Sequence, residues 1–259
     1  MALVITITNQ KGGVGKTTTA VNLAYFLARD RFRTLLVDID PQGNAGSALA
    51  INKDSLPATM TDVIAGDSKM SKAINSTQFD NFDIAPTTAN LANVEASIDN
   101  NSPERFLLLK RALATVKKDY DIIIVDSPPS LSLLTVCGLV AADYLLLPVQ
   151  TEFFALEGVS QLLRSMDLVK KAMNPNLKLL GVLATMTDTR TTLSKQVHTE
   201  LQKYFGKSVF RTTIPRSIRL AEAPSFGMPI GAYDRLNKGS RAYKSLAREV
   251  ENRIKGEGK

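Results

Sequence analysis

The sequence predicts an α/β fold: a mostly parallel, twisted sheet with helices on both faces, forming a single domain over residues 1–259. Short β-rich runs alternate with longer helical patterns along the chain, an order typical of strands joined by crossover helices. Several of the short runs are almost continuously apolar, which indicates strands covered on both faces. A chain of 259 residues can bury a substantial core and suits one large α/β domain.

Seven short apolar or β-branched runs are predicted to be strands. In chain order they are Leu3–Thr8, Thr34–Asp38, Phe82–Ala85, Asp121–Asp126, Tyr144–Pro148, Leu179–Thr185 and Ser208–Phe210. Residues 52–101 are rich in Asn, Ser, Thr and Asp. Apart from the strand within them, these residues carry the weakest pattern in the chain.

Longer helical patterns follow most of these runs. The predicted helices are Thr17–Asp30, Pro103–Lys118, Leu131–Ala141, Ala155–Met173, Thr192–Phe205 and Ser240–Ile254. In the last of them, Leu246, Val250 and Ile254 recur every four residues, which gives a narrow apolar stripe. Of two residues that could suggest other chemistry, we expect Cys137 in the core and His198 on the surface.

Positive charge is concentrated in the C-terminal part of the chain. The net charge is +7, and residues 186–259 hold 15 Lys and Arg against 7 Asp and Glu. This asymmetry indicates either a surface for a polyanion or a solvated, helix-rich tail, and charge alone leaves both open. No apolar run approaches the roughly 20 residues that span a bilayer, and no basic leader precedes the first strand. We therefore expect a cytoplasmic protein. The polar tail 249–259 lacks the bulky apolar residues of a membrane-binding helix, so we expect no membrane partner.

A glycine-rich loop directly follows the first predicted strand. Lys11-Gly12-Gly13-Val14-Gly15-Lys16-Thr17 stands between the strand and a helix. Glycines let backbone N–H groups turn toward an anion, and the start of a helix adds its positive dipole end. The usual phosphate-binding pattern places glycine where this chain has Gln10, and a second lysine, Lys11, opens the loop instead. We expect Lys16 to reach the outer phosphates and the Thr17 hydroxyl to bind Mg²⁺.

Carboxylates follow two further strands. Asp38 and Asp40 end the run Leu35-Leu36-Val37 before Pro41, and Asp126 ends the run Ile122–Val125. Ligands of open α/β sheets bind at the carboxyl ends of the strands. A hydrophobic strand that ends in Asp is the arrangement that holds Mg²⁺ in P-loop NTPases. The three segments together predict a site for a nucleoside triphosphate and Mg²⁺.

Four segments resemble the ParA/Soj partition ATPases of the MinD/ParA superfamily, P-loop proteins with a deviant Walker A motif. They are the loop 11–18, Val37-Asp-Ile-Asp-Pro-Gln-Gly-Asn, Val125-Asp-Ser-Pro-Pro and Ile214-Pro-Arg-Ser-Ile-Arg-Leu-Ala-Glu-Ala-Pro-Ser. The resemblance implies three catalytic residues, Lys11, Lys16 and Asp40. It implies nucleotide binding by Lys11, Gly12, Gly13, Val14, Gly15, Lys16, Thr17, Thr18 and Pro215, and a metal site at Thr17, Asp38 and Asp126. It also implies contacts with DNA at Arg190, Arg216 and Arg219.

The resemblance further implies a slow, Mg²⁺-dependent ATPase whose ATP-bound homodimer binds double-stranded DNA without sequence preference on the nucleoid. A ParB-like partner would stimulate hydrolysis and release. A physical argument also supports the dimer: two ammonium groups of one loop reach a single nucleotide awkwardly, whereas Lys11 can serve the nucleotide of a facing subunit. Two alternatives stay open, a MinD-like ATPase that cycles on membranes and an ATPase that positions another cargo on the nucleoid.

Overall fold

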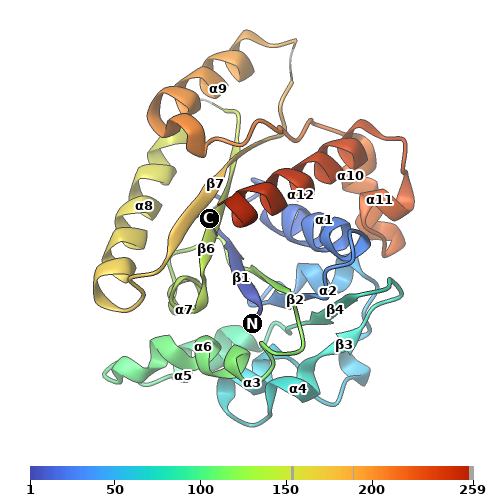
Figure 1. The fold of residues 1–259 in the computed structure, drawn as a ribbon. Helices are drawn as coiled ribbons and strands as arrows, with labels where there is room; N and C mark the ends of the chain where they lie inside the picture. The colour runs from blue at the N-terminus through green and yellow to red at the C-terminus, as the bar shows by residue number, and fades with distance from the viewer. Residues whose placement is uncertain (153–154, 189, 257–259) are drawn as a thin grey trace.

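The computed structural model describes residues 1–152, 155–188 and 190–256. One sheet runs through the middle of the molecule (Figure 1), with the strand order β3-β4-β2-β5-β1-β6-β7. The strands are β1 (Leu3–Ile7), β2 (Thr34–Asp38), β3 (Asn75–Ser76), β4 (Phe82–Ala85), β5 (Ile122–Asp126), β6 (Tyr144–Gln150) and β7 (Lys178–Thr185). All neighbouring strands pair in parallel except β3, which runs antiparallel to β4 at the edge.

Helices connect the strands, except β3 and β4, which a short turn joins. The longer helices are α1 (Lys16–Arg29), α7 (Leu133–Ala141), α8 (Ala155–Ala172), α9 (Thr192–Phe205) and α12 (Lys238–Gly256). Shorter ones are α2 (Asn44–Ala48), α3 (Met60–Ala65), α4 (Met70–Ala73), α5 (Leu91–Ser97), α6 (Leu108–Ala114), α10 (Ile218–Glu222) and α11 (Ile230–Tyr233). The described residues also form the 3₁₀ turns η1 (Lys53–Ser55), η2 (Pro103–Leu107), η3 (Gly206–Ser208) and η4 (Ala223–Phe226). The predicted α/β class is confirmed.

The side chains of the central strands divide between two cores, because successive residues of a strand point to opposite faces. On β5, Ile122 and Ile124 join the core under α1 and α12, whereas Ile123 and Val125 join the core under α3, α6 and α7. A third, smaller core lies between β6, β7, α8 and α9. Burial on both faces explains why these strands are almost continuously apolar in the sequence.

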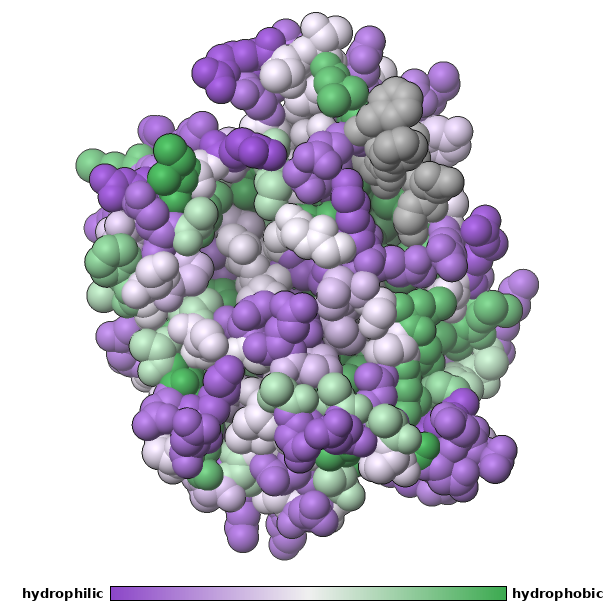
Figure 2. Space-filling model, turned by 180° about the vertical axis from the view of Figure 1, so that it is seen from behind, coloured by the Kyte–Doolittle hydropathy of each residue, from purple (hydrophilic) through white to green (hydrophobic). Residues whose placement is uncertain are grey.

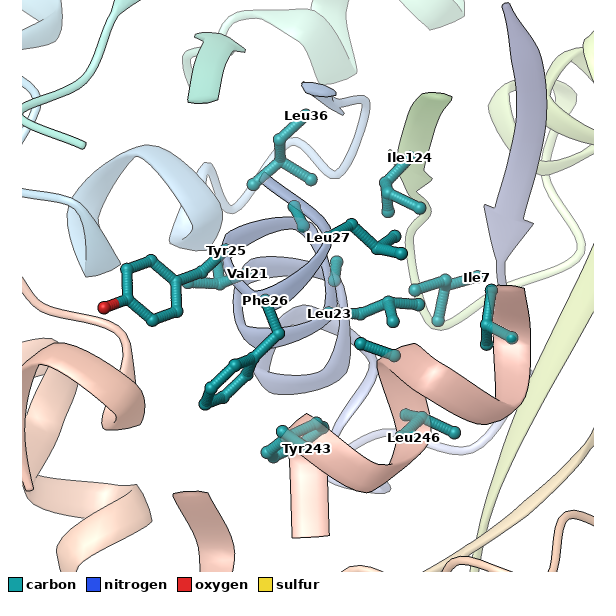
Figure 3. Close-up of a cluster of buried hydrophobic side chains, with 14 of the residues drawn as sticks. Ile7, Val21, Leu23, Tyr25, Phe26, Leu27, Leu36, Ile124, Tyr243 and Leu246 are labelled. Carbon is teal, nitrogen blue, oxygen red and sulfur yellow. The ribbon is translucent and has the colours of Figure 1, made fainter. Parts of the chain in front are cut away.

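Helix α1 occupies the centre of the first core. Figure 3 shows Leu23 and Leu27 of α1 directed toward Ile7 and Ile124 of the sheet, with Tyr243 and Leu246 of α12 below them in this view. The Tyr243 hydroxyl lies 3.2 Å from Thr19 Oγ1 of α1, a hydrogen bond that joins the two helices. Leu246 and Val250 of the predicted apolar stripe are buried in the same core, and Ile254 packs against it.

Leu23→Ala tests this core directly. Leu23 is fully buried, and its truncation leaves a cavity, so we expect the free energy of unfolding to fall by about 2–5 kcal/mol. Leu168→Ala is the matched control, because this helical leucine of α8 is 68% exposed and its loss should change stability by less than about 0.5 kcal/mol. Urea denaturation measures both variants. Equal losses would contradict the assigned core.

Two of the predicted elements differ in kind or extent, and β3 and the short helices α2, α3, α4, α5, α10 and α11 were not predicted. The predicted strand Ser208–Phe210 is wrong: η3 occupies its start, and only an isolated bridge joins Val209 to Val182. The reason is Arg253, whose guanidinium binds the carbonyl oxygens of Ser208 and Val209, so that these groups do not form a ladder. The predicted helix Pro103–Lys118 divides into η2 and α6 and ends at Ala114.

The surface is mixed in character. Figure 2 shows a face that is mostly hydrophilic, with hydrophobic residues in small groups. Among the helices of the described residues, none combines the length and the apolar composition needed to cross a membrane. Cys137 is buried in α7, as predicted, and His198 lies partly exposed on α9.

Candidate nucleotide site

The glycine-rich loop leaves β1, an inner strand next to β5, and ends at α1, at the carboxyl edge of the sheet. Gly13 and Gly15 have φ values of +73° and +88°, which glycine adopts without steric cost. α1 begins without a side-chain cap and without an acidic residue in its first turn. The free N–H groups and the helix dipole at this point favour an anion. Gly12, Gly15, Thr17 and Thr18 lie at or near the surface, so an anion can reach them.

Two side chains that sequence reasoning missed fix this loop to the neighbouring strands. Asn9 donates to the Pro148 carbonyl of β6 at 2.7 Å and accepts from the Lys11 N–H at 3.0 Å. The Thr185 hydroxyl of β7 donates to the carbonyl of Val14 at 2.8 Å, and Val14 itself is buried. The only sequence signal was the position of Asn9 just after a strand, since Asn side chains often bind nearby backbone groups.

The two lysines of the loop point in different directions. Lys16 is buried, and its ammonium donates to the Lys11 carbonyl at 3.1 Å. Burial lowers the pKa of Lys16, and the charges of Asp126 and Asp40 oppose this shift. The Lys11 ammonium instead pairs with Glu152 Oε2 at 3.1 Å, and both side chains are close to half exposed. Lys16 therefore faces the carboxylates of the site, while Lys11 lies toward its outer rim.

The carboxylates of β2 and β5 lie next to each other, because Asp38 and Asp126 are paired in the register of the two strands. Burial raises the pKa of Asp38 to about 7, and the charge of Asp40 adds to the shift. Burial, followed by the charge of Asp38, also raises the pKa of Asp126 well above its ordinary value. Two adjacent buried carboxylates cannot both ionise easily unless a cation lies between or beside them.

Asp126 has the features of a metal ligand. Both of its carboxylate oxygens are buried and have no hydrogen-bond partner of standard geometry among the described residues. The Thr17 hydroxyl lies close enough to favour its ionised form. Unsatisfied buried carboxylate oxygens are rare, and Mg²⁺ prefers oxygen ligands. Thr17 and Asp126 therefore fit a magnesium ion.

Asp38 and Asp40 are held by backbone. Asp38 Oδ1 accepts from the N–H of Asp40 and Asp38 Oδ2 from that of Ala45, at 3.0 and 3.1 Å. Asp40 is buried, and its Oδ1 accepts from the N–H of Gln42 at 3.0 Å. Gly43 completes the turn at φ +64°, where a Cβ would approach the Thr87 carbonyl oxygen to 2.8 Å. Within the described part of the chain, no three His, Cys, Asp or Glu side chains form a metal cluster. A cation at this site depends on further oxygen ligands, such as phosphates.

A cavity beside the loop has the size and character of a site for a base. Its volume is about 270 Å³, and apolar side chains dominate its wall. It is lined by Gly15, Thr18, Thr185, Met186, Ile214, Pro215, Arg216, Ser217, Leu220, Ala221 and Tyr243. Pro215 lines this cavity together with Gly15 and Thr18 of the phosphate loop. Tyr243 of α12 was missed, because the long separation along the chain hides this contact.

The three predicted DNA-binding arginines line one open hollow of about 1310 Å³, which we call the basic groove. Arg190 makes two contacts with Asp188, at 2.9 and 2.7 Å. Arg219 pairs with Glu222 at 3.0 Å and donates to the Tyr233 hydroxyl at 3.2 Å. Arg216 makes no side-chain hydrogen bond or ion pair among the described residues, and it lines both the groove and the smaller cavity.

The fold and the site together define a P-loop nucleoside triphosphatase. A family model described as an AAA domain matches residues 2–179. The chain is 50% identical over 250 residues to the sporulation initiation inhibitor protein Soj of Bacillus subtilis, covering 96% of this chain and 98% of that protein. It is 47% identical over 250 residues to the chromosome partitioning protein ParA of Myxococcus xanthus, covering 96% and 88%. The chain therefore belongs to the ParA/Soj family within this AAA class.

A solved structure supports the same fold. The cobyrinic acid a,c-diamide synthase of Mycobacterium smegmatis, with a bound ATP analog and magnesium, superposes with a TM-score of 0.88 at 36% identity. The match covers 99% of this chain and 97% of that one. The predicted resemblance and the predicted fold class are thus both confirmed.

Proposed function

We propose that this single-domain protein is an ATP-dependent DNA partition ATPase. Its ATP-bound form is a sandwich homodimer that binds double-stranded DNA without sequence preference. Hydrolysis, stimulated by a ParB-like partner, releases the DNA. The names of the relatives, a chromosome partitioning protein and Soj, support the partition role. The basic groove supports the contact with DNA.

The proposed chemistry assigns a role to each residue of the site. Lys16 and the loop N–H groups hold the phosphates, and Lys11 reaches the nucleotide of the facing subunit. Thr17 and Asp126 hold Mg²⁺ while Asp38 orients the turn beside it. Bound Mg²⁺ would neutralise charge on the phosphate oxygens. Asp40 orients the attacking water.

The surroundings of Lys16 agree with slow hydrolysis by the protein alone. Among the described residues, its ammonium is bound by the Lys11 carbonyl and is influenced by the charges of Asp126 and Asp40. These groups include no arginine, although Arg216 lines the adjoining cavity. An arginine beside the phosphates is the group that speeds phosphoryl transfer in many related enzymes, so its supply by a partner would raise the rate.

One segment of the chain lines both the nucleotide cavity and the basic groove, and this observation gives the proposal its main support. Pro215, Arg216 and Ser217 line both the cavity beside the phosphate loop and the basic groove. A nucleotide that shifts this segment therefore changes the groove directly. Such a connection is what a protein needs if ATP is to control its affinity for a polyanion.

Sedimentation with long DNA tests the function. With Mg²⁺ present, we expect the protein to sediment with DNA in ATP, but only weakly in ADP or without nucleotide. Lys16→Ala should remain in the supernatant under all three conditions, because it removes the ammonium that holds the phosphates. Equal sedimentation of the parent protein with and without ATP would contradict an ATP-controlled switch.

A further inference from the structure

Helix α12 carries a row of cations on its exposed face. Lys238, Arg241, Lys244 and Arg248 are all exposed, at spacings of three, three and four residues. The opposite face, with Tyr243, Leu246 and Val250, is buried against the core. At 1.5 Å per residue, the row extends about 15 Å along the helix. We call these four residues the α12 stripe.

The α12 stripe has no carboxylate in direct contact. None of its four side chains makes a hydrogen bond or an ion pair with any other described residue, and Lys238 acts on Asp188 only through its charge. The acidic residues of α12 are engaged elsewhere. Glu249 accepts from the N–H groups of Arg211 and Thr212, and Glu251 pairs with Lys255. Four neighbouring positive charges repel one another until an anion neutralises them.

The α12 stripe continues the basic groove, because two of its members, Lys238 and Arg241, also line the groove. Its cations differ from Arg190 and Arg219 in one respect. Those two arginines are already bound to Asp188 and Glu222, and a phosphate must displace these carboxylates before it gains a contact. The cations of the stripe need no such exchange.

We propose that the α12 stripe binds the phosphate backbone of double-stranded DNA and extends the basic groove along the helix. This inference rests on the proposed function, which supplies DNA as the partner. Along one strand, charges recur every 3.4 Å of helix axis, so the stripe spans roughly four phosphates. An anionic membrane is disfavoured, because the bulky apolar residues of α12 lie in the core. A single strand is also disfavoured, since the aromatic residue of α12, Tyr243, is buried and offers no surface for stacking.

The test compares charge reversals on the full chain. Arg241→Glu with Lys244→Glu should weaken binding to linear duplex DNA of mixed sequence in ATP and Mg²⁺. The slope of log affinity against log salt should become shallower by about 1.8, at about 0.9 for each phosphate that is no longer neutralised. Arg190→Glu should change the slope by less. Lys69→Glu with Lys72→Glu, on exposed positions before and within α4, is the matched control for net charge and should leave the slope unchanged.

Several outcomes overturn the proposal. If the α12 variant has an unchanged slope while the parent protein binds DNA, the α12 stripe does not contact DNA. The proposed function then still stands. An equal change in the α4 control shows that net charge alone is responsible. Loss of binding to phosphatidylglycerol vesicles, with DNA binding unaltered, assigns the stripe to a membrane. If the parent protein binds no DNA in ATP, the proposed function fails as well. Thermal unfolding checks folding, and Arg241→Gln with Lys244→Gln repeats the test without reversed charge.

Discussion

Asp40→Ala is expected to lock the protein on DNA. Asp40 is buried beside Lys16 and Asp126, where we propose that it orients the attacking water. Loss of a positioned acid–base group typically lowers a rate by about 10²- to 10⁴-fold. Nucleotide binding and dimerisation should persist, because Lys11, Lys16 and Thr17 are unchanged. In ATP and Mg²⁺ the variant should therefore release little phosphate and should sediment with DNA long after the parent protein has dissociated.

Asp40→Asn is the control for structure. The Asp40 side chain also accepts from the Gln42 N–H, and an amide oxygen can keep this bond while the negative charge is lost. If the charge orients water, both variants should be slow. If Asp40→Asn hydrolyses ATP at the parent rate and only Asp40→Ala is slow, the residue shapes the turn and the proposed catalytic role is wrong. Phosphate release in single-turnover experiments separates these outcomes.

Lys11→Ala is expected to abolish ATP-dependent dimerisation while retaining nucleotide binding. Within the monomer the Lys11 ammonium pairs with Glu152, and both side chains are close to half exposed. Such a pair contributes little to stability, about 0–1 kcal/mol, so the monomer should fold normally. Loss of one member of a buried charge pair at an interface costs about 2–5 kcal/mol. The dissociation constant of the ATP dimer should rise by roughly 30-fold or more.

Light scattering in ATP, together with binding of a fluorescent nucleotide, measures this prediction. Lys118→Ala removes another exposed lysine and should dimerise normally. Glu152→Gln removes the partner of Lys11 within the chain, and it should dimerise at least as well as the parent protein. Equal dimer populations in Lys11→Ala and the parent would show that the second lysine of the loop does not act between subunits.

The sequence predicted the strands of the sheet well because burial on both faces requires continuous apolar runs. The bounds of β2 and β4 agree with the prediction at both ends. The phosphate loop and the three aspartates were also found from sequence, since each stands at the end of a strand or within a few residues of it. Ser208–Phe210 was mistaken for a strand because the residue that occupies its carbonyls, Arg253, lies more than forty positions away.

The sequence by itself determined the α/β class, the loop that cradles phosphates, the carboxylates of the site and the excess of positive charge near the C-terminus. These features are local, because backbone freedom, strand periodicity and charge are written in neighbouring residues. The tertiary structure decided which distant groups meet. Asn9 and Thr185 bind the phosphate loop, Tyr243 lines the cavity beside it, and Glu152 pairs with Lys11. It also decided which cations are already paired with a carboxylate, because pairing depends on the position of each carboxylate in space and not on its place in the chain.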